Sequence, residues 1–192
     1  LPLDSIPLRA IQEADDLIHA FDTRDVALVA TDLTGTNALG FSGTFDTVDY
    51  PTSTMLYVGF NTASGPCRSG EVRQALSRAF DRASIATVLY ARHAQAAALP
   101  VSPASPLYQA DVAAELDHDP QAAAELLEQA GRQDLALTLL APADNPARTA
   151  AAELLADGLE NLGLTVTLDL LPWPDYLAAL EQGDFDLYLG EV

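Results

Sequence analysis

The sequence predicts an α/β fold with a mixed, largely parallel sheet and helices on both of its faces. First, helical and strand patterns alternate through residues 117–192, an order that implies right-handed crossovers between parallel strands. Second, 49% of the 192 residues are hydrophobic, enough for one sizeable core. Third, a strand pattern near residue 57 gives the sheet a member from the first half of the chain.

The N-terminal part is predicted to hold several strands and one helix. Alternating or continuous apolar residues indicate strands at residues 5–11, 25–30, 44–50 and 53–61. A short helical pattern occupies residues 13–21, and residues 31–43 are rich in Thr, Gly and Asn, which is typical of a loop.

Residues 70–90 predict two helices separated by a break at Asp81. Apolar residues recur at helical spacing on both sides of this residue, and its carboxylate is suited to cap the second helix. Four of the nine basic residues lie close by, namely Arg68, Arg73, Arg78 and Arg82. Because Arg73 and Arg78 lie roughly 140° apart on a helix, they do not converge as a phosphate clamp would. We expect them to lie on the solvent side, paired with local acids.

The second half begins with a proline-rich loop at residues 98–108, followed by alternating elements. Helices are predicted at residues 117–131, 145–163 and 172–183, and strands at 135–141, 164–171 and 184–192. Capping residues support the boundaries. Asp119 with Pro120, and Asn145 with Pro146, stand at helix starts, and Gly131 and Gly163 stand just past helix ends.

The charge and composition of the chain exclude several classes of function. The 28 acidic residues outnumber the 9 basic ones, and the net charge of −19 argues against nucleic acid and anionic lipid as partners. No residue is a lysine, so Walker A and Schiff-base chemistry are absent. The single cysteine, Cys67, allows no intrachain disulfide. No apolar run reaches the length of a membrane span.

Two motifs allow a catalytic or metal-binding interpretation. Asp117, His118 and Asp119 carry ligand groups for a divalent ion, but adjacent residues converge poorly and Asp119 fits better as a helix cap. Cys67 precedes a helix start, but the sequence arranges no base beside it. We therefore expect no catalytic residue, metal or cofactor.

Four segments resemble family 5 of the extracellular solute-binding proteins, the oligopeptide, dipeptide and nickel receptors of bacterial ABC importers. They are "YVGFNTASGPCRSGEVRQALSRAFDR", "ALPVSPASPLY", "HDPQAAAELLEQAG" and "AAAELLADGLENLGLTVTLDLLPWPDYLAALEQGDFDLYL". Their order and spacing over residues 55–190 carry the resemblance. The chain departs from the family in having Cys67 where an aromatic residue or Leu is frequent, and in lacking Lys.

The resemblance implies a lobe like those of type II periplasmic binding proteins. We expect residues 1–192 to be a single lobe, the second, C-terminal-side ligand-binding lobe of a larger two-lobe receptor. Implied partners are a peptide or other small solute, the missing lobe of the same chain and a membrane permease. The implied function is solute binding with hinge closure, not catalysis. The implied location is extracytoplasmic, in the periplasm or as a cell-surface lipoprotein, with the signal segment absent from this sequence.

In this family the solute lies in the cleft between lobes, so candidate ligand residues are those in loops at strand ends. They are Tyr90, Ser102, Ser105, Tyr108, Asn145, Arg148, Gly190 and Glu191. Arg148, near a helix start, suits a peptide carboxylate, and Glu191 suits a ligand amine. An ordinary surface arginine and a frayed Glu191 are the alternatives.

Two rival functions remain open from the sequence. One is a cysteine- or metal-dependent hydrolase. Loss of activity on removal of Cys67, or tightly held metal in the purified protein, would favour it. The other is a sensory or adaptor module that keeps the lobe for protein contacts and transports nothing. The sequence does not identify the solute.

Overall fold

The computed structural model describes residues 5–29, 40–42, 44–48, 50, 52, 54–90 and 93–192. The chain divides into two compact units, Leu1–Tyr50 and Pro51–Val192. Whether residues 1–192 act as one lobe of a larger receptor stays a prediction.

The first unit is built on helix α1 (Ala14–Asp22), as the helical pattern predicts. The Phe21 ring packs against Phe41 and Phe45, with ring centroids 4.7 and 6.0 Å away. The Asp22 carboxylate accepts hydrogen bonds from the backbone N–H and the hydroxyl of Ser42, at 3.1 and 2.6 Å. These contacts fix the described residues near the end of α1.

Three strand predictions in this unit are wrong wherever the residues are described. Residues 5–11, 25–29, 44–48 and 50 form no strand. Leu8 and Leu28 are 95% and 84% exposed, so the apolar positions of these patterns do not face a core. Alternation alone supplies no partner for the backbone hydrogen bonds of a strand. The predicted loop at residues 31–43 falls almost entirely outside the described residues.

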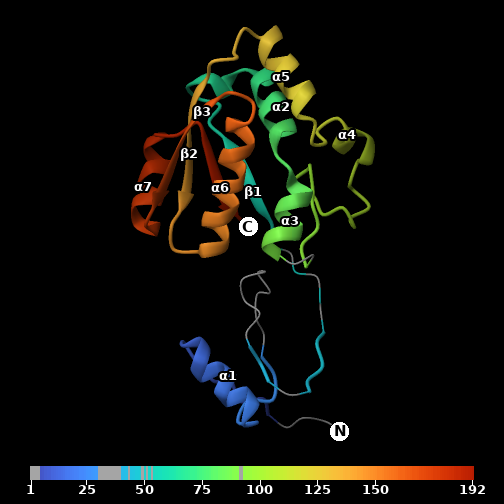
Figure 1. Cartoon of the computed structure of the whole chain (residues 1–192), viewed down its shortest axis with the longest axis vertical. Coiled ribbons are helices and arrows are strands. Elements are labelled where there is room, and N and C mark those ends of the chain that lie inside the picture. Colours follow the sequence, from blue (N-terminus) through green and yellow to red (C-terminus); the bar gives the residue numbers. More distant parts are fainter. Residues whose placement is uncertain are drawn as a thin grey trace. The chain divides into compact units, whose positions relative to one another are not determined.

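The second unit contains a four-stranded sheet with the order β1-β4-β2-β3 (Figure 1). Its strands are β1 (Leu56–Phe60), β2 (Ala136–Pro142), β3 (Thr165–Leu171) and β4 (Leu187–Glu191). Strand β2 pairs in parallel with both β3 and β4, and β1 runs antiparallel to β4. The prediction of a mixed, largely parallel sheet is confirmed, as are all four of these strands.

The helices of this unit are α2 (Gly70–Ala79), α3 (Arg82–Tyr90), α4 (Ala110–Ala114), α5 (Pro120–Gln129), α6 (Pro146–Glu160) and α7 (Trp173–Gln182). The sequence predicts all of them except the short α4. Cys67 lies in a single 3₁₀ turn, Pro66–Arg68. The proline-rich stretch at residues 98–108 forms turns and bends, as expected.

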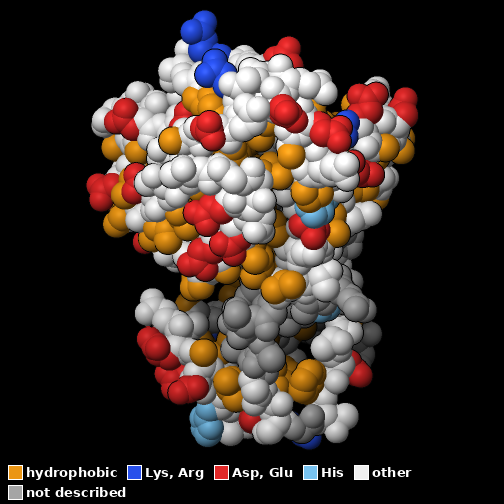
Figure 2. Space-filling model, turned by 45° about the horizontal axis from the view of Figure 1, so that its top comes forward, with side chains coloured by type: hydrophobic (Ala, Val, Ile, Leu, Met, Phe, Trp, Pro, Cys, Tyr) orange, Lys and Arg blue, Asp and Glu red, His pale blue; other side chains and the backbone are white. Residues whose placement is uncertain are grey.

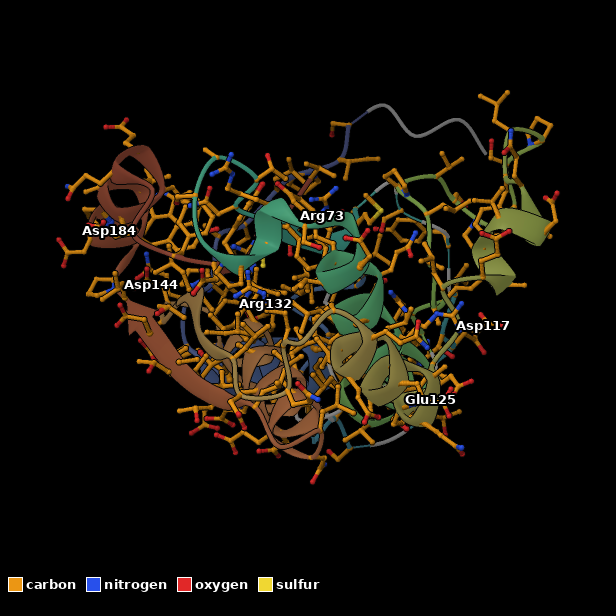
Figure 3. The ribbon with its side chains drawn as sticks, turned by 90° about the horizontal axis from the view of Figure 1, so that it is seen from above. Arg73, Asp117, Glu125, Arg132, Asp144 and Asp184 are labelled. Atoms are coloured by element: carbon orange, nitrogen blue, oxygen red, sulfur yellow. The ribbon has the colours of Figure 1, made fainter. Side chains whose placement is uncertain are left out.

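Helices α6 and α7 cover opposite faces of the sheet (Figure 3). The connection through α6 leads from β2 outward to β3, whereas the connection through α7 leads back past β2 to β4. Right-handed crossovers in opposite directions place their helices on opposite faces. The predicted covering of both faces is therefore confirmed.

The hydrophobic core lies on the α6 face of the sheet. Its largest fully buried side chains include Leu76, Leu137, Leu139, Leu159 and Leu187. Helices α2 and α6 supply Leu76 and Leu159, and the alternating inward positions of β2 and β4 supply the others. The core thus anchors the strands while leaving their other face to α7.

The predicted break at Asp81 is confirmed. Its Oδ1 accepts a hydrogen bond from the Ser84 N–H at 2.9 Å, and its Oδ2 accepts one from the Ser84 hydroxyl at 2.6 Å. The hydrogen bonds from Ser84, and then the charge of His118, hold the pKa of Asp81 below its usual value. Asp81 is therefore a helix cap, as the sequence indicates.

Among the described residues, two of the arginines near this break, Arg73 and Arg82, bond to neighbouring scaffold groups and not to acids as predicted. Arg73 donates to the backbone carbonyls of Cys67 and Arg68, at 2.8 and 3.0 Å. Arg82 donates to the Leu116 carbonyl at 3.0 Å and to the Ser77 hydroxyl at 2.6 Å. Carbonyl oxygens of turns are local and fixed, so they satisfy a guanidinium fork without an acid.

Candidate functional site

A groove of about 420 Å³ lies on the sheet face opposite the core, beside α7. It is lined by Tyr57, Arg148, Trp173, Tyr176, Leu177, Leu180, Phe185, Tyr188, Leu189, Gly190 and Glu191. Five of these residues are aromatic, and only two carry a formal charge at neutral pH. The lining is thus apolar apart from one charged end, the composition typical of small-ligand sites.

The topology explains why these residues meet. The carboxyl ends of parallel strands β2, β3 and β4 lie at one edge of the sheet. Arg148 follows β2 in the chain, Trp173 follows β3, and Glu191 ends β4. In open α/β sheets, ligands bind outside the carboxyl ends of the strands.

Tyr57 and Tyr188 form the floor of the groove. In the antiparallel register of β1 and β4, Tyr57 faces Gly190 and Tyr188 faces Gly59, so each ring lies over a glycine. A Cβ added at Gly190 would lie 2.6 Å from Tyr57 Cζ, and one at Gly59 would overlap the Tyr188 ring. The two rings meet edge to face, with centroids 5.8 Å apart. Glycine at both positions therefore sets the depth of the floor.

The hydroxyls of Tyr188 and Tyr176 are uncharged at neutral pH. A hydrogen bond with Tyr57, together with burial, raises the pKa of Tyr188 to about 12. Burial also raises the pKa of Tyr176. These groups offer neutral hydrogen-bond donors and acceptors to a ligand.

Helix α7 supplies the wall. The Trp173 indole stacks on the Tyr176 ring, with centroids 5.4 Å apart and planes inclined by 23°. The Tyr176 hydroxyl donates to the Leu189 carbonyl at 3.0 Å, which ties α7 to β4. The Trp173 backbone N–H donates to the Asp144 carboxylate at 2.6 Å. Trp173 is 47% exposed, so much of its surface stays open to a ligand.

Arg148 and Glu191 form an ion pair at the charged end. Arg148 Nη2 lies 2.6 Å from Glu191 Oε1, and Arg148 Nε lies 3.3 Å from Glu191 Oε2. Asn145 Oδ1 accepts from the N–H groups of Ala147 and Arg148, at 3.0 and 3.2 Å, and so caps α6. Glu191 is held in β4 by pairing with Leu56, so it is not frayed.

The structure brings three of the predicted ligand residues together, namely Arg148, Gly190 and Glu191. Asn145 lies one turn from Arg148, with its side chain used for capping. Tyr90 ends α3, and Ser102, Ser105 and Tyr108 lie in the proline-rich loop. These last four do not line the groove, and a ligand role for any of the eight stays a prediction.

Sequence reasoning missed the aromatic lining. The sequence patterns explain each of these aromatic residues as an ordinary member of a strand or helix, so none was predicted to bind a ligand. They are Tyr57, Trp173, Tyr176, Phe185 and Tyr188. A signal does exist, since the stretches LYVGF and LYLGE each place a Tyr and a Gly two residues apart among apolar residues. Such alternation indicates a strand in which both faces make defined contacts, one with the core and one through the Tyr and Gly residues.

Neither catalytic interpretation gains support from the geometry. Cys67 has no exposed surface, and burial and the nearby Asp186 raise the pKa of its thiol to about 12. Asp119 caps α5, with its Oδ1 2.9 Å from the Ala122 N–H. His118 Nδ1 lies 3.8 Å from the Asp81 carboxylate. The residues that the structure describes contain no cluster of three or more potential metal ligands.

The chain as a whole is strongly acidic, with a net charge of −19. Figure 2 shows Asp and Glu side chains spread over the visible face, with few Arg among them. A second hollow of about 320 Å³ is lined by Ser69, Glu71, Leu126, Gln129, Ala130 and Arg132, and it lacks aromatic residues.

Among the helices of the described residues, none combines the length and apolar character needed to cross a bilayer.

Comparisons with known proteins identify the family of this chain. The family model of the bacterial extracellular solute-binding proteins, family 5 (middle region), matches residues 2–192. The probable di/tripeptide-binding protein 5 of Pseudomonas aeruginosa is 30% identical over 141 residues, which cover 71% of this chain and 26% of that protein. Heme-binding protein A of Haemophilus influenzae is 28% identical, with 68% and 24% covered. The chain thus spans about a quarter of the length of these relatives.

Solved structures show the same fold. A putative peptide-binding protein AppA from Clostridium difficile matches with a TM-score of 0.81 and 19% identity, over 96% of this chain and 39% of that one. The oligopeptide-binding protein AppA of Bacillus subtilis, solved with a nonapeptide, matches with a TM-score of 0.71 and 22% identity, over 94% and 39%. The expected relation to type II periplasmic binding proteins is confirmed. The chain belongs to family 5 of the bacterial extracellular solute-binding proteins, whose members bind solutes.

Proposed function

We propose that the groove beside α7 is part of the binding surface for a peptide in the receptor of an ABC importer. The observation that carries this proposal is the convergence of five aromatic side chains and one ion pair at the carboxyl edge of the sheet. Aromatic walls bind apolar side chains, and the polar groups orient the backbone. Support also comes from the relatives, several of which are named as peptide-binding proteins.

We further propose that this chain supplies one side of the site. A second lobe, contributed by the same polypeptide, would supply the other side and close over the solute by a hinge motion. Closure stabilises the state in which both surfaces contact the ligand. The closed receptor would deliver its peptide to a membrane permease. In this proposal the receptor works outside the cytoplasm, in the periplasm or held at the cell surface by a lipid anchor.

The test is ligand-observed saturation-transfer NMR of the protein with a mixed library of di- to pentapeptides. Wild type should transfer saturation to peptides that carry apolar or aromatic residues. Trp173→Ala removes the exposed face of the wall and should reduce the transfer several-fold, whereas Tyr50→Ala, at a 68% exposed aromatic in the first unit, should not. Circular dichroism checks that both variants stay folded.

If Trp173→Ala leaves the saturation transfer unchanged, the peptides bind elsewhere and the proposal is refuted. Absence of transfer to any peptide would also contradict it, and would favour an adaptor module that binds no solute.

A further inference from the structure

Arg148 is the only basic residue among those that line the groove, and its guanidinium is already engaged. Two of its nitrogens, Nη2 and Nε, contact the two carboxylate oxygens of Glu191. This bidentate geometry is the one in which guanidinium and carboxylate bind most favourably. An incoming ligand carboxylate would have to displace Glu191 or lie beside it.

The exposure of the two partners makes displacement unfavourable. The side chain of Arg148 is 18% exposed and that of Glu191 is 33% exposed, so the acid is the more accessible member of the pair. The Asp144 carboxylate, which does not line the groove, accepts a hydrogen bond from the Trp173 N–H. A ligand carboxylate at this end would therefore approach the Glu191 carboxylate and one cation that is already paired.

The net charge of the whole chain also disfavours a ligand carboxylate in the groove. With a net charge of −19, the surrounding potential repels anions and attracts cations. The rest of the lining is aromatic or aliphatic, and the phenol groups with raised pKa values, Tyr176 and Tyr188, carry no charge at neutral pH.

We propose that Glu191 occupies Arg148 and so makes this groove select against ligand carboxylates, and that the groove accepts an uncharged apolar or aromatic part of the ligand. Glu191 is thus a specificity-determining residue. This inference rests on the proposed function, because it assigns the charge preference of the same groove. It differs from the expectation drawn from the sequence, in which Arg148 receives a peptide carboxylate.

The experiment compares two probes that differ only in the charge of one end. They are N-acetyl-Leu-Phe-amide, which is neutral, and N-acetyl-Leu-Phe with a free carboxylate. Trp173 is the only tryptophan of the sequence, so its fluorescence reports binding at the wall of the groove. At pH 7.5 and low salt, wild type should bind the amide about tenfold or more tightly than the acid, because the acid meets the Glu191 carboxylate and the negative potential of the chain.

Glu191→Gln should abolish this preference. The amide side chain keeps the shape of Glu191 but frees the guanidinium, so the acid should bind as well as the amide or better. Glu160→Gln is the matched control: it removes the same charge at an exposed position at the far end of α6 and should leave the preference at the wild-type value.

The inference is overturned if the wild type binds the acid as tightly as the amide, or if Glu191→Gln leaves the ratio of affinities unchanged. Failure to bind the amide at all also overturns it, because an uncharged ligand is then not accepted. The peptide library separates these outcomes from failure of the proposed function, which appears as no saturation transfer to any peptide or as transfer that Trp173→Ala does not affect.

Discussion

At the scale of single residues, Gly190 and Gly59 determine where the tyrosine rings of the groove lie. A methyl group at Gly190 would lie 2.6 Å from the Tyr57 ring, so the ring must move toward the groove. We predict that Gly190→Ala destabilises the protein by about 1–3 kcal/mol, the usual effect of overpacking. It should also weaken peptide binding, because the displaced ring fills part of the groove.

Thermal unfolding and NMR titration measure the two effects. Gly70→Ala is the control, since its added methyl would meet only the end of the Arg73 side chain, at 3.9 Å. An unchanged melting temperature in Gly190→Ala would show that the strand shifts freely and that glycine does not fix the floor.

Asp81 offers a test of helix capping away from the groove. We predict that Asp81→Ala costs about 1 kcal/mol because the N–H of Ser84 loses its acceptor. Asp81→Asn keeps a side-chain oxygen and should cost less. Chemical denaturation compares the three proteins, and equal midpoints for wild type and Asp81→Ala would refute the capping role. Peptide binding should not change in either variant.

The pH dependence of this contribution has a definite sign. The pKa of Asp81 is lowered in the folded protein, first by hydrogen bonds from Ser84, so the folded state binds the proton less readily than the unfolded state. The stabilisation is fully present above the unfolded pKa, about 3.9, and is lost as pH falls through the folded value. The difference in melting temperature between wild type and Asp81→Asn should therefore shrink as pH is lowered from 5 to 3. A constant difference would contradict this.

Single residues also show which parts of the site can be predicted from sequence. The caps Asp81, Asp119 and Asn145 were predictable because each bonds to an N–H two or three residues later in the chain. The contact between Arg148 and Glu191 was not, because it joins residues 43 positions apart. Both residues were predicted to bind the ligand, but Arg148 was expected to bind a carboxylate and Glu191 an amine.

At the scale of elements, the Tyr176 hydroxyl connects α7 to β4. Tyr176 is buried, and its hydroxyl donates to the Leu189 carbonyl. We predict that Tyr176→Phe lowers stability by about 1–2 kcal/mol, since the carbonyl loses a buried donor. Peptide binding should weaken as well, because α7, which carries Trp173, loses its hydrogen bond to β4.

Tyr50→Phe, at an exposed tyrosine, is the matched control and should change neither property. Denaturation and the peptide titration measure both variants. Full stability in Tyr176→Phe would mean that stacking alone positions α7.

The elements of the second half were predictable because alternating helices and strands specify their own partners. Parallel strands joined by helices meet in one sheet, so β2, β3 and β4 satisfy each other's backbone groups. The N-terminal patterns lack such neighbours among the described residues, and residues 5–11 and 25–29 form no strand. Helix α4 was missed because its five residues are too few for a periodic pattern.

At the scale of the whole molecule, the groove is partly open to solvent, as the 47% exposure of Trp173 shows. If a second lobe supplies half of the contacts and excludes water, this chain alone should retain only a small part of the affinity. We predict that it binds peptides no more tightly than about 1 mM, or about −4 kcal/mol, against about 1 μM for a two-lobed receptor. Calorimetry of both proteins tests this, and micromolar binding by residues 1–192 would show that they hold a complete site.

The most direct test of the groove as the peptide site is an NMR titration of the isotope-labelled protein with the peptide library, followed at each assigned backbone amide and at the Trp173 indole. We predict that the largest shift changes fall on residues that line the groove, with Tyr57, Trp173 and Glu191 among them. Changes centred on the proline-rich loop at Ser102, Ser105 and Tyr108, or on the second hollow around Ser69 and Arg132, would contradict the account.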